Sequence, residues 1–132
     1  MIVVDTSAMF AIAARERERD AFVGLLDQTD VAVCSSVTYL ETVMVLTGRS
    51  RAVAKSAVEE LLRAFGIEVT PVDLIVTDVA VDAFNRYGKG RHRAALNLAD
   101  CFSYALAKSR DAPLLFKGDD FSQTDIAAAW QP

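Results

Sequence analysis

Short runs of mainly apolar, β-branched residues recur along the chain, and longer stretches that mix apolar and polar positions separate them. Such runs are typical of buried strands when polar residues bound them. They predict strands at residues 2–4, 31–34, 67–72 and 113–116.

Apolar residues in the intervening stretches lie three or four positions apart, which is the spacing of one helix face. This spacing predicts two helices or one bent helix over residues 7–28, and further helices over 37–47, 50–65, 74–87 and 96–109. Ser35 and Ser36 can cap the helix that follows them, and Gly66 is suited to end the helix before it. The charged sequence RERERD at residues 15–20 is expected to form a solvated helical face.

Strands that alternate with helices, without tight hairpin signals, are typical of an α/β fold with a parallel sheet. We therefore expect a parallel-sheet α/β/α sandwich, with helices on both faces, in a single domain that spans residues 1–132. In sheets of this kind, ligands bind beyond the carboxyl ends of the strands. Asp5 lies at such an end, directly after the first predicted strand.

The composition narrows the class of protein further. With 52% hydrophobic residues and a net charge of −4, the chain is typical of a compact globular protein rather than of one that coats nucleic acid through bulk charge. Cys34 and Cys101 form no metal-binding pattern, which favours buried free thiols and a cytoplasmic location. The apolar run near the N-terminus is interrupted by Asp5 and is too short to span a bilayer, so we expect no membrane association.

Several acidic residues occupy positions with apolar neighbours or follow a predicted strand. They are Asp5, Glu41, Asp100 in the nearly uncharged stretch LNLADCFSYALA, and the pair Asp119 and Asp120. Taken one at a time, each has a structural explanation as a helix cap, an ion-pair partner or a turn residue; Asp100, for example, can cap its helix near Asn97. Together they can meet at one end of the sheet, where like charges repel unless a cation lies among them. Carboxylate oxygens without His or Cys suit Mg²⁺ or Mn²⁺.

The segments VVDTSA, TYLETVMVL, LNLADCFSYALA and LLFKGDDFSQTDI, in this order and spacing, resemble the PIN-domain ribonucleases, and most closely the VapC toxins of prokaryotic toxin–antitoxin pairs. The resemblance covers essentially the whole chain. It implies a metal-dependent ribonuclease that hydrolyses RNA phosphodiester bonds as the toxin of a type II toxin–antitoxin module. It also implies a homodimer and a small antitoxin whose C-terminal segment presents a basic side chain to the acidic residues.

The same resemblance implies roles for individual residues. Asp5, Glu41, Asp100 and Asp119 form the acidic site, in which Asp5 and Asp100 are the surest ligands of Mg²⁺ or Mn²⁺. Supporting residues are Thr6 or Ser7, whose hydroxyl braces the site, and Asn97. The doubled aspartate leaves the fourth acid open between Asp119 and Asp120, and Asp125 is a further candidate.

Residues 83–99 contain no Asp or Glu, and their basic side chains are candidates to bind RNA phosphates. These candidates are Arg86, Lys89, Arg91 and Arg93, with Tyr87 available to stack on a base. The alternative is a merely solvated turn. His92, in the same stretch, is expected to be a surface residue rather than a general base, because a metal-bound water can be the nucleophile.

Other functional classes fit less well. A phosphatase of the haloacid dehalogenase type needs a second acid two positions after Asp5, where Ser7 stands, and a signalling receiver domain needs an aspartate at the end of the strand at 31–34. A non-toxin housekeeping nuclease and a catalytically inactive RNA- or protein-binding module remain as alternatives.

Overall fold

Four parallel strands form one sheet in the part of the chain that the computed structural model describes, residues 1–48 and 54–132. The strands are β1 (Ile2–Val4), β2 (Ala32–Ser35), β3 (Ile67–Thr70) and β4 (Leu114–Leu115), in the order β3-β2-β1-β4. Val3 of the inner strand β1 pairs with Val33 on one side and Leu114 on the other. The predicted strands and their parallel arrangement are thus confirmed.

Helices follow the strands at nearly all the predicted places. They are α1 (Thr6–Ala13), α2 (Arg19–Asp27), α3 (Ser36–Thr47), α4 (Ala54–Ala64), α5 (Leu74–Tyr87), α6 (Leu98–Ser109) and the short 3₁₀ helix η1 (Phe121–Gln123). Residues 50–53 of the helix predicted over 50–65 lie outside the described residues. Gly66 ends α4 with a positive φ of 62°, which a residue without a side chain adopts readily.

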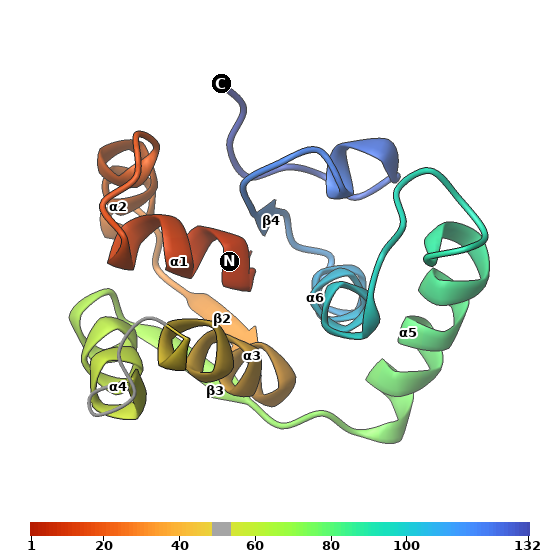
Figure 1. Cartoon of the computed structure of the whole chain (residues 1–132), viewed down its shortest axis with the longest axis horizontal. Coiled ribbons are helices and arrows are strands. Elements are labelled where there is room, and N and C mark those ends of the chain that lie inside the picture. The colour runs from red at the N-terminus through yellow and green to blue at the C-terminus, as the bar shows by residue number, and fades with distance from the viewer. Residues whose placement is uncertain (49–53) are drawn as a thin grey trace.

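Side chains alternate across the strands, so each face of the sheet has its own core. On one face, Ile2, Val4 and Cys34 pack with apolar residues of α1, α2 and α4. On the other, Val3 and Val33 pack with α5 and α6. Figure 1 shows these two groups of helices on opposite sides of the sheet. The α/β/α sandwich is therefore confirmed, and Cys34 and Cys101 are buried free thiols, as predicted.

Some predicted elements were too long, among them the strand predicted over 113–116, and the prediction for the charged stretch was wrong. The strand predicted to residue 72 ends at Thr70, because Pro71 has no N–H for the ladder. The helix predicted from residue 96 begins at Leu98, with Asn97 as its cap. The charged stretch 15–20 is not a continuous helical face: it turns between α1 and α2, and Glu16 and Glu18 pair with Lys117 at 3.0 and 3.1 Å.

The topology brings distant segments to the carboxyl edge of the sheet. Because β4 lies beside β1, the turn after Leu115 comes next to Asp5, whose N–H donates to the Leu115 carbonyl at 2.9 Å. Helix α3 starts directly after β2, and it contacts both α1 and α6. The residues that follow β1, β2 and β4, together with α6, therefore surround one region.

Candidate functional site

Asp5 is the buried centre of this region, with 3% of its surface exposed. It caps α1: Oδ2 accepts hydrogen bonds from the Ser7 N–H at 2.9 Å and from the Ser7 hydroxyl at 2.7 Å. Among the described residues, Oδ1 accepts one hydrogen bond, from the Ser103 hydroxyl at 2.6 Å. Since a carboxylate oxygen has about two lone-pair sites, Oδ2 is saturated and Oδ1 keeps one site for a further partner.

Ser7 and Thr6 connect Asp5 to its neighbours. The Ser7 hydroxyl also accepts from the backbone N–H of Lys117 at 3.0 Å, which ties the first turn of α1 to the turn after β4. Thr6 is buried, its hydroxyl lies 3.4 Å from that of Thr42, and it donates to the carboxylate of Glu41. Both hydroxyls that the resemblance suggested as braces therefore contact a carboxylate of the region.

Glu41 lies on α3, half-buried at the border of the core. Burial raises the pKa of its carboxyl, the Thr6 hydrogen bond opposes that rise, and the charge of Asp5 adds to it. Because the charge of Asp5 affects the pKa of Glu41, the carboxylates of Asp5 and Glu41 lie near each other, although they come from different elements.

Asp100 lies in the first turn of α6 and forms a capping box with Asn97. Its Oδ2 accepts from the Asn97 N–H at 3.0 Å, and its own N–H donates to Asn97 Oδ1 at 2.8 Å. The capping role that the sequence suggested for Asp100 is confirmed. The same carboxylate also lies near Asp5, Glu41 and Asp120, and we call these four residues the acidic region. Burial and then the charges of Asp5, Asp120 and Glu41 raise the pKa of Asp100 to about 7, against an opposing effect of the Asn97 hydrogen bond.

The three candidates for the fourth acid lie in different surroundings. Asp120 acts electrostatically on Asp100, so it belongs to the acidic region. Asp119 lines a neighbouring cleft together with Lys117. Asp125 is held by the Tyr104 hydroxyl at 2.5 Å and by Lys108 at 3.1 Å, and these contacts lower its pKa. The structure therefore groups Asp120 with Asp5, Glu41 and Asp100, and gives Asp125 a structural ion pair.

A set of buried hydroxyls behind Asp5 was missed by the sequence analysis. Ser103 lies 3.2 Å from the Thr38 hydroxyl, which in turn lies 3.2 Å from that of Ser35. All of these side chains are buried. The one available signal was the position of Ser103, three residues after Asp100 and therefore on the same side of the helix.

The basic stretch that begins in the last turn of α5 is partly engaged within the molecule. Arg86 lies 3.6 Å from Asp125 and donates to the Tyr87 hydroxyl at 2.9 Å, and Arg91 lies over the ring of Phe84. Lys89 and Arg93 are exposed. The suggestion that Tyr87 stacks on a base was wrong, because its ring is buried against those of His92 and Tyr104.

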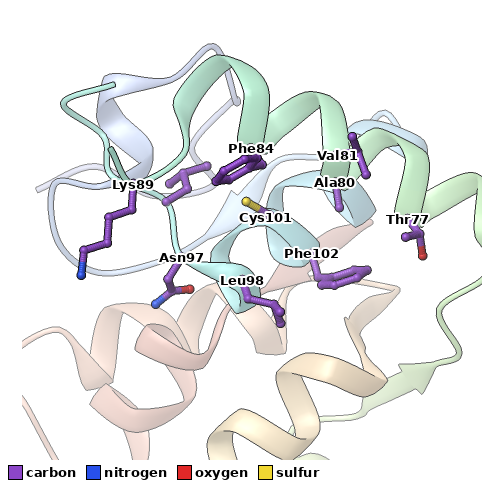
Figure 2. Close-up of a pocket in the computed structure, with 10 residues that line it drawn as sticks. Thr77, Ala80, Val81, Phe84, Lys89, Asn97, Leu98, Cys101 and Phe102 are labelled. Atoms are coloured by element: carbon purple, nitrogen blue, oxygen red, sulfur yellow. The ribbon is translucent and has the colours of Figure 1, made fainter. Parts of the chain in front are cut away.

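An apolar groove of about 540 Å³ runs between α5 and α6. Val81 and Phe84 of α5 face Leu98 and Phe102 of α6 across it, and Lys89 and Asn97 lie at one end (Figure 2). Leu98 is 72% exposed, which is unusual for so large an apolar side chain. Because Asn97 lines the groove and shares a capping box with Asp100, this end of the groove lies next to Asp100.

Comparison with known proteins assigns the family. The family model described as PIN domain matches residues 2–127. The chain belongs to the PIN domain family. A protein named Ribonuclease VapC from Mycolicibacterium smegmatis is 42% identical over 127 residues, which cover 96% of this chain and 98% of that protein.

Solved structures agree with this assignment at the level of the fold. A crystal structure of VapC20 from Mycobacterium tuberculosis, described as a sarcin-ricin loop cleaving toxin, superposes with a TM-score of 0.79 at 21% identity and full coverage of both chains. A toxin–antitoxin complex from Klebsiella pneumoniae gives a TM-score of 0.74 at 15% identity, also with full coverage. At these identities, the structures support the PIN fold alone.

The acidic region of this PIN domain fits a divalent cation by charge and donor type. Burial, and then the mutual repulsion of these carboxylates, raises the pKa of Asp100 and Glu41, and a cation among them would relieve the repulsion. Across the described ranges, no three acidic, cysteine or histidine side chains approach closely enough to enclose an ion as they stand.

No helix in residues 1–48 and 54–132 is both long enough and apolar enough to cross a membrane.

Proposed function

We propose that this PIN domain, residues 1–132, is a divalent-metal-dependent ribonuclease that acts in the cytoplasm as the toxin of a type II toxin–antitoxin module. The observation that carries the proposal is the meeting of Asp5, Glu41, Asp100 and Asp120 at the carboxyl edge of the sheet. One lone pair of Asp5 Oδ1 is not used by the hydrogen bonds from residues 1–48 and 54–132. The name of the Mycolicibacterium relative supports the same activity.

Each carboxylate has a task in this proposal. Asp5, through Oδ1, and Asp100 would hold Mg²⁺ or Mn²⁺, and Glu41 and Asp120 would complete the negative region around the ion. A bound ion of this kind activates a water for attack on a phosphodiester and offsets charge on the leaving oxygen. Ser7 holds the Asp5 carboxylate in place, and Asn97 holds that of Asp100.

A polyanion needs positive charge to bind beside such an acidic region. We assign this task to Lys89, Arg91 and Arg93, because Lys89 stands at the end of the groove where Asn97 and the acidic region begin. Arg86 is the weakest of the four predicted candidates, since Asp125 and Tyr87 already engage it.

The antitoxin of this proposal would use the groove between α5 and α6. An antitoxin segment with apolar side chains fits the lining of Val81, Phe84 and Leu98, and a basic residue following them would reach Asp100. A bidentate arginine suits a carboxylate partner.

Expression of the chain alone should arrest the growth of its host, and co-expression of a small protein encoded beside it should restore growth. If the chain alone leaves growth unaffected while it cleaves RNA, a housekeeping nuclease replaces the toxin.

The homodimer also remains a proposal. The outer face of α4 carries Lys55, Glu59 and Arg63, whereas α3 exposes Leu40 and Met44. Met44 is 64% exposed, so we place the dimer contact on α3 rather than on the helix that follows it. Replacing Met44→Asp should convert the dimer to a monomer in light scattering.

The ribonuclease is tested with the purified chain and a labelled RNA. Cleavage should require Mg²⁺ or Mn²⁺ and should stop when EDTA is added. It should also disappear in the variants Asp5→Asn and Asp100→Asn, whose circular dichroism spectra should match that of the wild type. Asp27→Asn, which changes an exposed carboxylate at the end of α2, is the matched control and should retain cleavage. Near wild-type turnover in both site variants would exclude the assigned site.

A further inference from the structure

The hydrogen bond between Ser103 and Asp5 joins two elements that are far apart in the chain. Ser103 lies on α6 and is 1% exposed, and its hydroxyl donates to Asp5 Oδ1 at 2.6 Å across 98 positions of sequence. A hydroxyl that donates to an ionised carboxylate at this distance makes a strong, charge-assisted hydrogen bond.

The direction of the neighbouring hydrogen bonds follows from this contact. An ionised carboxylate only accepts, so the single proton of Ser103 points at Asp5. The Thr38 hydroxyl, 3.2 Å away, must then donate to Ser103, and the Ser35 hydroxyl must donate to Thr38. The three hydroxyls form a directed chain, of which Ser103 is the member that contacts Asp5.

Ser7 and Ser103 determine which lone pair of Asp5 remains for a ligand. Ser7 fills both sites of Oδ2, and Ser103 fills one of the two sites of Oδ1. Ser103 also lies one turn after Asp100 on α6, so the same hydrogen bond ties Asp5 to the helix that carries Asp100.

We infer that Ser103 is a positioning residue: it fixes the Asp5 carboxylate against α6, so that Asp5 binds a divalent cation through a single lone pair of Oδ1 at a set distance from Asp100. The inference rests on the metal-dependent site proposed above. Packing alone does not require a hydroxyl here, because alanine fills such a position and has the higher helix propensity.

The test is the affinity for Mn²⁺ without RNA, measured from the electron paramagnetic resonance signal of free Mn²⁺. Ser103→Ala should bind Mn²⁺ about tenfold more weakly than the wild type, as is typical when a group that orients a metal ligand is removed. Ser103→Thr, which keeps the hydroxyl, should restore the affinity. Ser103→Cys keeps the shape but has a weak donor, so its affinity should fall between those of the wild type and the alanine variant.

Ser35→Ala is the matched control. It removes a buried serine hydroxyl that caps α3 through the Thr38 N–H, at 3.0 Å, but it leaves the Ser103–Asp5 contact in place. It should lower the melting temperature while Mn²⁺ affinity stays within about twofold. A loss of affinity as large as that of Ser103→Ala would show that the effect comes from general destabilisation, and would overturn the inference.

The outcomes separate the inference from the ribonuclease proposal. If Ser103→Ala, or Ser103→Cys should the alanine variant not fold, binds Mn²⁺ as tightly as a wild type that cleaves RNA, the inference is wrong and the ribonuclease stands. If the wild type binds Mn²⁺, the variant binds it about tenfold more weakly and neither cleaves RNA, the positioning role stands and the ribonuclease proposal is wrong. A wild type that binds no Mn²⁺ overturns both.

Discussion

Replacing Asp100→Asn should stabilise the metal-free protein above neutral pH, although it removes a proposed ligand. Burial and the charges of Asp5, Asp120 and Glu41 raise the pKa of Asp100 from its usual 3.8 to about 7. The folded state therefore favours the protonated carboxyl, and Asp100 costs stability progressively as the pH rises from about 4 to 7. An asparagine keeps the shape and an oxygen that accepts from the Asn97 N–H, without the charge.

The size of the effect follows from the two pKa values. At about 1.4 kcal/mol per tenfold change in proton affinity, they set an upper limit of about 4 kcal/mol. Solvent screening at this half-buried position and the lost attraction between a charge and the helix N-terminus reduce the net gain to roughly 1–2 kcal/mol.

Urea unfolding in EDTA at pH 4, 5, 6, 7 and 8 measures this difference. The Asp100→Asn variant should approach the wild type near pH 4, and its advantage in free energy of unfolding should grow between pH 4 and 7 and be largest at pH 8. With saturating Mn²⁺ the order at pH 8 should reverse, because the ion stabilises only the protein that binds it. Asp27→Asn should show no such dependence. A difference between Asp100→Asn and the wild type that is the same at all pH values would refute the reasoning.

Three further predictions concern other parts of the site. Arg91→Gln with Arg93→Gln, measured in the Asp5→Asn background, should reduce the salt slope of RNA binding by roughly 1.4 log units per log unit of salt; an unchanged slope would remove this pair from the RNA path. Asp120→Asn should abolish cleavage and Asp119→Asn should reduce it less, and the opposite order in the same cleavage assay would restore the original choice of fourth acid. Asp125→Asn should lower the free energy of unfolding by about 1 kcal/mol at pH 7. Because its contacts lower the pKa of Asp125, this loss should vanish on acidification below its usual 3.8, and a loss that persists there would contradict the assignment.

The sequence predicted those parts of the site that depend on element order. Asp5 follows a buried strand, and Asp100 is an isolated charge in an apolar helix, so both positions were visible without coordinates. The choice between Asp119 and Asp120 was not visible, because it depends on the backbone of the turn around Gly118, where φ is 100°. In such a turn, a shift of one residue changes the direction of a side chain entirely.

The roles of some other residues could not be predicted from the sequence for a different reason. Ser103 is one example. The sequence around a serine in an apolar helix does not show whether its side chain only packs or also donates a hydrogen bond to a residue 98 positions away. Tyr87 shows the converse error: a basic neighbourhood suggested an exposed ring, but the last turn of α5 faces the core. Likewise, Glu16 and Glu18 form ion pairs with Lys117, which is distant in the sequence, and not with residues of one continuous helix.

The chemistry of the cut ends tests the central claim most directly. If carboxylate-bound metal activates a water, RNA cleaved by the purified wild type should carry no 2′,3′-cyclic phosphate, and both EDTA and Asp5→Asn should abolish the products. Mass spectrometry of the fragments, with Asp27→Asn as the control, reads out both points. Products that end in a 2′,3′-cyclic phosphate, or that persist in EDTA, would contradict a metal-dependent hydrolysis at Asp5 and Asp100.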